Sequence, residues 1–205
     1  MYLNDFLVGR FSEAKPTAPS NRIIKNMSET IDFKDEFLQD EELDMGSINH
    51  SIAQTKLTSL LDNDDRFATF VELSLDASSI DLSKFSLKAR YELVPDVCVY
   101  SSPPPEPDKE VEDDILSVSQ MPDLAIEVLS PSQSVGYLVR KIKAYFALGV
   151  KSCWLVVPSM EAIDVYPQVD QHRTFDMNDT EVIDEVMDIH LPIAKVFKRP
   201  SNQKH

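Results

Sequence analysis

The chain has 205 residues, of which 42% are hydrophobic and 27% are charged, so it is large enough for one globular domain with a substantial core. Its net charge of −15 argues mildly against tight binding of duplex DNA, although a local basic groove is compatible with that charge. No apolar run approaches the roughly 18 residues of a membrane span, and no secretory signal is recognisable, so we expect a cytoplasmic protein without membrane contact.

The two ends of the chain and one internal segment are predicted to contain little regular structure. Residues 1–40 have scattered prolines and charges without a sustained period, and we interpret them as an N-terminal extension. The domain is predicted over 41–198, followed by a tail at 199–205. Within it, the acidic, proline-rich segment 101–120 is unusually long for a connection, so we expect it to be flexible or to cover a site.

The first predicted elements each carry one candidate accessory residue. A helix is predicted over 48–61 with Ser47 as its N-cap. His50 lies at the edge of its apolar face, and is either a histidine that borders the core or a group that reaches a functional site. Residues 67–75 are predicted to form a strand, in which Glu72 is either a solvent-facing acid or a supplementary acid of the site.

A second strand is predicted over 92–100, with a bend at Pro95 and Asp96 just after it. The two cysteines, Cys98 and Cys153, both lie in predicted strands, and we expect reduced core thiols in preference to a disulfide. No Cys-x-x-Cys or His-x-x-x-His spacing occurs, which argues against a structural zinc site.

Residues 121–158 are predicted to form a βαβ unit around which the domain is organised. An apolar run over 123–129 predicts the first strand, a helical period follows the break at 130–132, and Gly149 ends the helix before a second apolar run at 153–157. Such a unit has parallel strands and a right-handed crossover by default. Later elements are predicted as outer strands at 162–166 and 173–176 and as a closing strand with a short helix at 189–197.

Within this unit one acid and one lysine occupy positions that are otherwise apolar. Glu127 has apolar neighbours in a strand that is expected to be covered on both faces. Steps of about 100° per residue place Lys141 inside the apolar arc of the helix, whereas Arg140 and Lys143 fall outside it. A buried ammonium without a counter-charge is costly or loses its proton, so Glu127 is the expected partner of Lys141.

Asp96, Glu127 and Lys141 together form a candidate catalytic constellation. Two carboxylates on neighbouring strands suit Mg²⁺, which prefers oxygen ligands and keeps several waters. Such an ion activates water and neutralises charge on a phosphate, while a nearby ammonium orients water or phosphate. The set therefore suits hydrolysis of a phosphodiester, with Asp96 and Glu127 as metal ligands. A Lys–Glu pair in an α/β core can equally be structural.

Several stretches of the chain together resemble a known family. They are VPDV at 94–97, PDLAIEVLSPS at 122–132, Lys141, Tyr145, Gly149-Val150, and WLVVP at 154–158. Over roughly residues 41–197, the chain is similar to the Uma-two family of the PD-(D/E)XK, restriction-endonuclease-like superfamily. The resemblance implies an α/β fold with a central mixed β-sheet flanked by α-helices. It also implies an endonuclease site that uses Mg²⁺, or Mn²⁺ in its place, to cut DNA.

Carried over by position, the resemblance assigns Asp96 to the Pro-Asp motif and Glu127 to the acid of the (D/E)XK motif. The chain departs from the superfamily at the lysine position of that motif, which is Leu129 here. Lys141 on the next helix is the residue that takes the place of that lysine. By analogy with superfamily members that cut two strands, the resemblance also implies a homodimer.

Two other functions stay open from the sequence. A nuclease-like fold kept as an interaction or regulatory module, with little or no cleavage, is favoured by the acidic charge and by Leu129. The retained acid pair and the inward lysine favour the enzyme. A serine nucleophile at 130–132 is a weaker hypothesis, because a turn and a helix N-cap explain those serines without a paired histidine or an elbow glycine.

Overall fold

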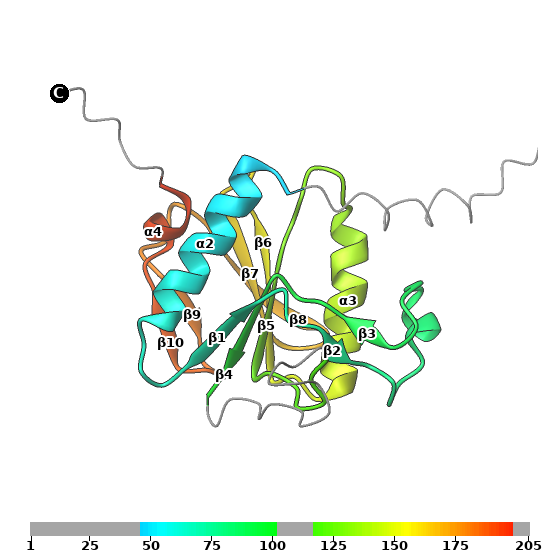
Figure 1. The fold of residues 1–205 in the computed structure, drawn as a ribbon. Helices are drawn as coiled ribbons and strands as arrows, with labels where there is room; N and C mark the ends of the chain where they lie inside the picture. The colour runs from blue at the N-terminus through cyan, green and yellow to red at the C-terminus, as the bar shows by residue number, and fades with distance from the viewer. Residues whose placement is uncertain (1–45, 102–116, 199–205) are drawn as a thin grey trace, which may run out of the picture. The chain divides into compact units, whose positions relative to one another are not determined.

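The structure is a computed structural model that describes residues 46–101 and 117–198, and its centre is a mixed six-stranded sheet (Figure 1). The strands lie in the order β1–β4–β5–β6–β7–β8. β5 and β6 are parallel, and the other neighbouring pairs of this sheet are antiparallel. The strand bounds are β1 Ala68–Val71, β4 Val97–Tyr100, β5 Leu124–Val128, β6 Ser152–Val157, β7 Ala162–Gln168 and β8 Gln171–Phe175.

The parallel pair is joined by helix α3 (Val135–Leu148), which confirms the predicted βαβ unit. Ser134 caps the start of α3 by accepting a hydrogen bond from the main-chain N–H of Tyr137. Gly149 ends the helix with φ 100°, a left-handed conformation that glycine adopts without a steric penalty. Every residue of β5 and β6 is buried, as expected for central strands covered on both faces.

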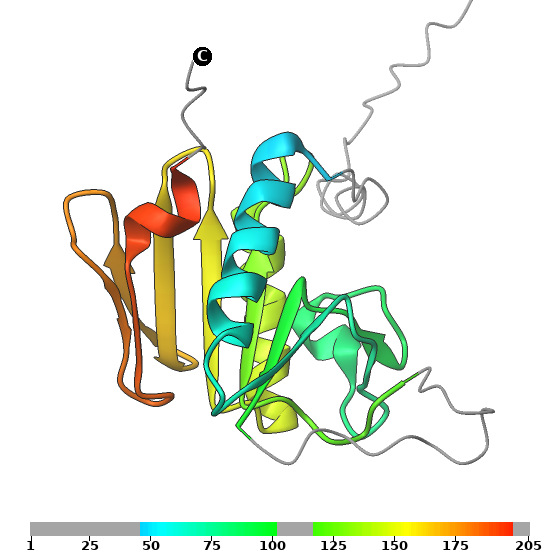
Figure 2. The ribbon, with the colours of Figure 1, turned by 60° about the vertical axis from the view of Figure 1, so that its left-hand side comes forward.

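Alternation along the strands sends side chains into two cores on opposite faces of the sheet. The helices that cover the sheet can be followed in Figure 2. Val97, Ile126 and Trp154 lie in one core, which is closed by α2, α4 and the β9–β10 hairpin. Cys98 and Ala125 lie in the other, which is closed by α3, the 3₁₀ helix η1 and the β2–β3 ribbon. The bounds of these elements are α2 Ile48–Asp62, α4 Ile193–Phe197, β9 Val182–Asp184, β10 Ile189–Leu191, η1 Leu82–Phe85, β2 Leu75–Asp76 and β3 Glu92–Leu93.

Two predicted strands are interrupted because the chain turns inside them. The strand predicted over 67–75 ends at Val71, since Glu72 adopts φ 52°, and β structure resumes only at β2. The strand predicted over 92–100 divides at the bend by Pro95 into β3 and β4. The strand β9 was not predicted, because it lies in an acidic stretch whose composition favours a loop.

Two other predictions, the cap of α2 and the reduced cysteines, are confirmed by the described residues. Ser47 caps α2 by accepting a hydrogen bond from the main-chain N–H of His50. Cys98 and Cys153 are buried and unbonded. Within residues 46–101 and 117–198, no helix has both the length and the apolarity needed to cross a membrane. The predictions for 1–40, for the acidic segment at 102–116 and for 199–205 lie outside the described residues.

A buried carboxylate ties the β9–β10 hairpin to the central sheet. Asp184 of β9 is only 1% exposed. Its Oδ2 accepts hydrogen bonds from Ser152 Oγ at 2.6 Å and from Trp154 Nε1 at 2.7 Å. Its Oδ1 accepts hydrogen bonds from the main-chain N–H groups of Val186 and Met187 at 3.0 and 3.1 Å. Four donors thus depend on one acid in the protein interior.

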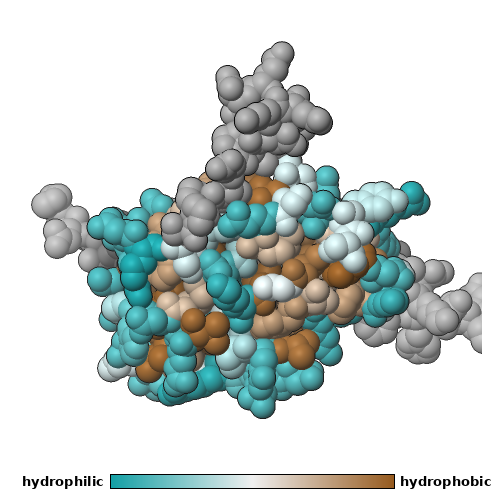
Figure 3. Space-filling view, turned by 90° about the horizontal axis from the view of Figure 1, so that it is seen from below, coloured by the Kyte–Doolittle hydropathy of each residue, from teal (hydrophilic) through white to brown (hydrophobic). Residues whose placement is uncertain are grey.

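The surface is not uniformly polar despite the acidic composition. On the face seen in Figure 3, hydrophobic residues appear at the centre and hydrophilic residues surround them. The net charge of the chain therefore says little about any single face, and each surface has to be judged from its own residues.

Candidate active site

The two candidate metal ligands lie near each other, Asp96 just before β4 and Glu127 in β5. β4 and β5 pair with Val97 across from Ile126, and continuing this register by one residue brings Asp96 opposite Glu127. Asp96 lies at the bend just before β4, close enough for its carboxylate to raise the pKa of Glu127. The Oδ2 of Asp96 also accepts a hydrogen bond from the main-chain N–H of Val128 at 2.6 Å. The two acids therefore meet where β4 begins.

Lys141 points inward from α3 and pairs with Glu127, as the helical period predicts. Its Nζ lies 2.7 Å from Oε1 and 2.8 Å from Oε2 of Glu127, and it donates a hydrogen bond to the carbonyl of Val94 at 3.0 Å. Tyr145, one turn further along α3, donates its hydroxyl to Glu127 Oε1. Glu127 is 2% exposed and Lys141 8%, whereas Lys143 is exposed. The predicted ion pair is confirmed, and it is buried.

Burial and charge act in opposite directions on this pair. Desolvation raises the pKa of Glu127 to about 7, a rise that the Lys141 ammonium reduces and the Asp96 carboxylate increases. Desolvation also lowers the pKa of Lys141, but attraction to the Glu127 carboxylate outweighs this effect, so the pKa of Lys141 is raised. Lys141 therefore stays protonated at neutral pH, while Glu127 changes its charge close to neutrality.

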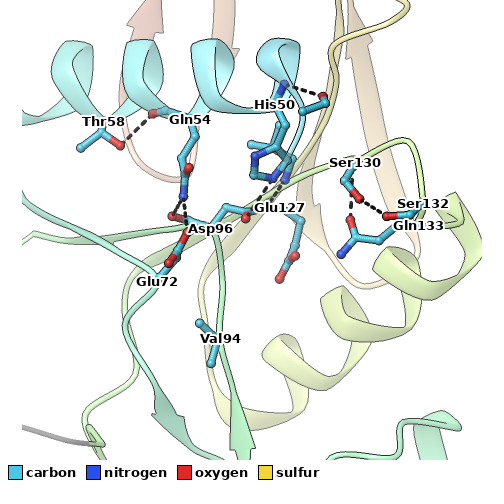
Figure 4. Close-up of polar contacts among 12 residues, drawn as sticks. His50, Gln54, Thr58, Glu72, Val94, Asp96, Glu127, Ser130, Ser132 and Gln133 are labelled. Atoms are coloured by element: carbon cyan, nitrogen blue, oxygen red, sulfur yellow. Dashed lines mark hydrogen bonds and ion pairs between the residues drawn. The ribbon is translucent and has the colours of Figure 1, made fainter. Parts of the chain in front are cut away.

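Helix α2 supplies two side chains to Asp96 (Figure 4). His50 is buried, and its Nε2 lies 3.2 Å from Asp96 Oδ1. Gln54 donates through Nε2 to the main-chain carbonyl of Asp96 at 3.1 Å and to Glu72 Oε1 at 3.4 Å. The main-chain N–H of Glu72 also donates to the Asp96 carbonyl, at 3.3 Å. His50 thus contacts a candidate site residue directly, whereas Glu72 joins the group through its main chain and Gln54.

Solvent reaches this group from the side of Asp96. The Asp96 side chain is 14% exposed, against 2% for Glu127. A cavity of about 350 Å³ lies just after the carboxyl end of β5, and neither acid lines it. It is lined by Ser47, Asn49, Leu129, Ser130, Pro131, Gln133, Pro158 and Ser159. The candidate site is therefore a partly covered acid pair, with Asp96 at its mouth and Glu127 beneath.

Two residues of this group were not predicted to belong to a site. Gln54 follows His50 by four positions on α2, and Tyr145 follows Lys141 by four positions on α3. Residues four apart on a helix lie on the same face, so each one reaches the same neighbourhood as the residue that was predicted. That spacing is the signal by which Gln54 and Tyr145 could have been found.

Other polar residues near the site are explained by local structure. Asp123, just before β5, pairs with Lys151 at 2.6 Å and accepts a hydrogen bond from the main-chain N–H of Ser101 at 2.7 Å, so its partners lie outside the acid pair. The Ser130 and Ser132 hydroxyls lie 3.2 Å apart in the turn before α3, at the place where a turn was preferred to a serine nucleophile.

The donor set of the acid pair fits a hard divalent cation. The charge of Asp96 raises the pKa of Glu127, and a divalent cation bound by both would relieve that repulsion. No cluster of three or more His, Cys, Asp or Glu side chains suited to a metal ion occurs in residues 46–101 and 117–198. Asp96 and Glu127 alone would then supply the side-chain ligands, and water and substrate oxygens would complete the coordination, as Mg²⁺ commonly accepts.

Comparisons with known proteins agree with this architecture. No curated protein matches the chain. A crystal structure described as a putative nuclease belonging to DUF820, from Anabaena variabilis ATCC 29413, has a TM-score of 0.59 and 24% identity, and the match covers 75% of this chain and 82% of that one. This likeness shows the fold, which is restriction-endonuclease-like. Residues 30–194 match the model of Uma2, described as a putative restriction endonuclease. Because that match spans well over half of the sequence, the chain belongs to the Uma2 family.

Proposed function

We propose that this protein is an endonuclease that hydrolyses phosphodiester bonds of DNA with Mg²⁺, or with Mn²⁺ in its place. Membership of the Uma2 family supports a nuclease in general terms. The observation that carries the finer proposal is the convergence of Asp96, Glu127 and Lys141 from two strands and one helix. That group combines two oxygen ligands with one fixed ammonium, which is what in-line attack on a phosphate diester requires.

The residues of the site would have distinct roles. Asp96 and Glu127 would hold the cation, which when bound acidifies water and neutralises phosphate charge. Lys141 would present an ammonium, fixed by Glu127 and by the Val94 carbonyl, to the attacking water or to a phosphate oxygen. His50 would orient the Asp96 carboxylate from α2.

A second function is favoured by one specific observation. Both oxygens of Glu127 already contact Lys141, and Oε1 also accepts the Tyr145 hydroxyl in a nearly solvent-free position. A buried ion pair of this kind also occurs as a structural or specificity device. In that case the fold serves as an interaction module, and divalent cations do not bind.

Calorimetric titration with Mn²⁺ and nicking of supercoiled plasmid separate the two functions. The enzyme proposal expects wild-type protein to bind Mn²⁺ and to nick DNA, and expects Asp96→Asn to lose both with little change in stability. Asp123→Asn is the matched control, since it removes a carboxylate from the loop before β5 that pairs with Lys151 outside the site. Absence of Mn²⁺ binding in folded wild-type protein would reject the enzyme proposal in favour of the module.

Metal binding should depend on pH because the pKa of Glu127 is raised to about 7 by burial. A carboxylate binds a cation only after it loses its proton, so the protonated form below this pKa competes with the metal. We expect the Mn²⁺ affinity to fall by about fivefold on going from roughly pH 7 to pH 6, and to change little above roughly pH 8. An affinity that is constant over this range would show that Glu127 is not a ligand.

A further inference from the structure

The cations of the described chain are unevenly distributed between its faces. The segment 82–91, which contains η1, has Lys84, Lys88 and Arg90 and no Asp or Glu. Helix α3 likewise has three cations and no acid. These two acid-free elements contact each other and lie side by side in Figures 1 and 2. In a chain of net charge −15, their combination is a local basic surface.

Three cations of this surface, Lys84, Arg90 and Lys143, are exposed and form no ion pair with a described residue. Arg140 stacks over the Tyr137 ring, and its Nε has no hydrogen-bond partner among the residues that the structure describes. We call Lys84, Lys88, Arg90, Arg140 and Lys143 the basic face.

The basic face adjoins the candidate active site along the chain. Arg90 precedes Asp96 by six residues, and β3 and Pro95 connect the two. Six extended residues span at most about 20 Å, which corresponds to about six nucleotides of one DNA strand. On α3, Arg140 and Lys143 flank Lys141, which points inward to Glu127. The carbonyl of Val94, between Arg90 and Asp96, accepts a hydrogen bond from Lys141, so this segment and α3 approach each other beside Glu127.

We propose that the basic face binds the phosphate backbone of the nucleic-acid substrate and guides it to Asp96 and Glu127. This inference rests on the proposed endonuclease function and assigns its substrate-binding surface. A hollow of about 440 Å³ on this surface is lined by Lys88 and Arg90 and, on its border, by Asp81. Contacts with the phosphate backbone supply affinity without reading sequence.

The test compares two triple variants with the same change of charge. Lys84→Ala/Arg90→Ala/Lys143→Ala removes three cations of the basic face. Arg173→Ala/Lys195→Ala/Lys198→Ala removes three exposed cations elsewhere, one in β8, one in α4 and one directly after α4. Binding is measured by fluorescence anisotropy without divalent metal, on a labelled duplex of about 20 base pairs and on its single strand, over a range of salt concentrations.

The basic-face variant should bind about 10- to 100-fold more weakly near 0.1 M salt, and should lower the salt slope by about 2 to 3, while the control variant stays near wild type. Both variants should hydrolyse bis(p-nitrophenyl) phosphate like wild type, because none of these residues lies in the acid site. Equal effects of the two variants on DNA binding would overturn this inference alone. If wild type cleaves the small diester but binds polyglutamate as tightly as it binds DNA, the inference is wrong and the surface binds an acidic protein instead. If wild type neither binds DNA nor cleaves the small diester, the proposed function itself fails.

Discussion

Replacing Lys141 by methionine should lower the free energy of unfolding by about 3–5 kcal/mol and reduce plasmid nicking by at least about 100-fold. The stability effect arises because Glu127 stays buried without its counter-charge, at a position that is 2% exposed. The rate effect is expected because the ammonium that would orient water or phosphate is lost. Chemical denaturation and a nicking assay with Mg²⁺ measure the two effects.

Lys143→Met is the matched control for this substitution. It makes the same chemical change two residues further along α3, at an exposed position without an ion pair among the described residues. We expect a change in unfolding free energy within about 0.5 kcal/mol and nearly normal cleavage of a small diester. A loss of stability equal to that of Lys141→Met would show that the effect comes from helix α3 in general and not from the buried pair.

A third variant separates the structural role of the pair from its proposed chemical role. Glu127→Leu/Lys141→Met/Tyr145→Phe replaces the whole buried polar group by apolar side chains of similar size. Such replacements are often neutral or stabilising, so most of the stability lost in Lys141→Met should return. Nicking should remain absent because ligand and ammonium are both gone. Nicking by this triple variant would exclude Glu127 and Lys141 from catalysis.

Asp184→Ala should destabilise the protein by about 3–5 kcal/mol, which is large for one substitution. The Trp154 indole N–H and the main-chain N–H of Met187 would lose their acceptor in a buried place, the partly buried N–H of Val186 would lose its acceptor too, and the Ser152 hydroxyl would keep only the carbonyl of Tyr166. Each orphaned donor costs about 1–3 kcal/mol, and local relaxation keeps the sum below simple addition. The change in unfolding free energy can be measured by urea denaturation followed through Trp154 fluorescence.

Glu185→Ala serves as the control for Asp184→Ala. It removes an exposed acid next in the sequence, and the surface change should alter the unfolding free energy by less than about 0.5 kcal/mol. Asp184→Asn should destabilise the protein more than Glu185→Ala and less than Asp184→Ala. The amide oxygen of asparagine still accepts some of these hydrogen bonds, but its NH₂ group would face other donors. A stability of Asp184→Ala equal to that of wild type would mean that solvent or other groups satisfy these donors.

The candidate site shows where local pattern is sufficient and where it is not. The pairing of Lys141 with Glu127 follows from the alternation of side chains along a strand and from the helical period. The helix of a βαβ unit packs on one face of the sheet, so its inward residues meet the strand residues that point to that face. The position of Asp96 opposite Glu127 does not follow from periods. It depends on the antiparallel register of β4 and β5, whose connection includes residues outside the described part of the chain.

Interruptions of predicted elements have a similar origin. Pro95 marks a bend that any reader of the sequence can find, and the structure has that bend. Glu72 gives no such warning, since a glutamate rarely adopts positive φ, and its turn is supported by the hydrogen bond from its main-chain N–H to the Asp96 carbonyl. Tertiary contacts thus override the local preference for a continuous strand.

By itself the sequence determined the βαβ unit, the buried Glu127–Lys141 pair, the helix that carries His50 and the family resemblance, because each of these depends on residues close together in the chain or on a fixed period. Only the tertiary structure decided that His50 and Gln54 meet Asp96, and that Asp184 joins a hairpin to β6. The physical reason is that these contacts join segments that are far apart in sequence. Their register is set by packing of the two cores and not by any local preference.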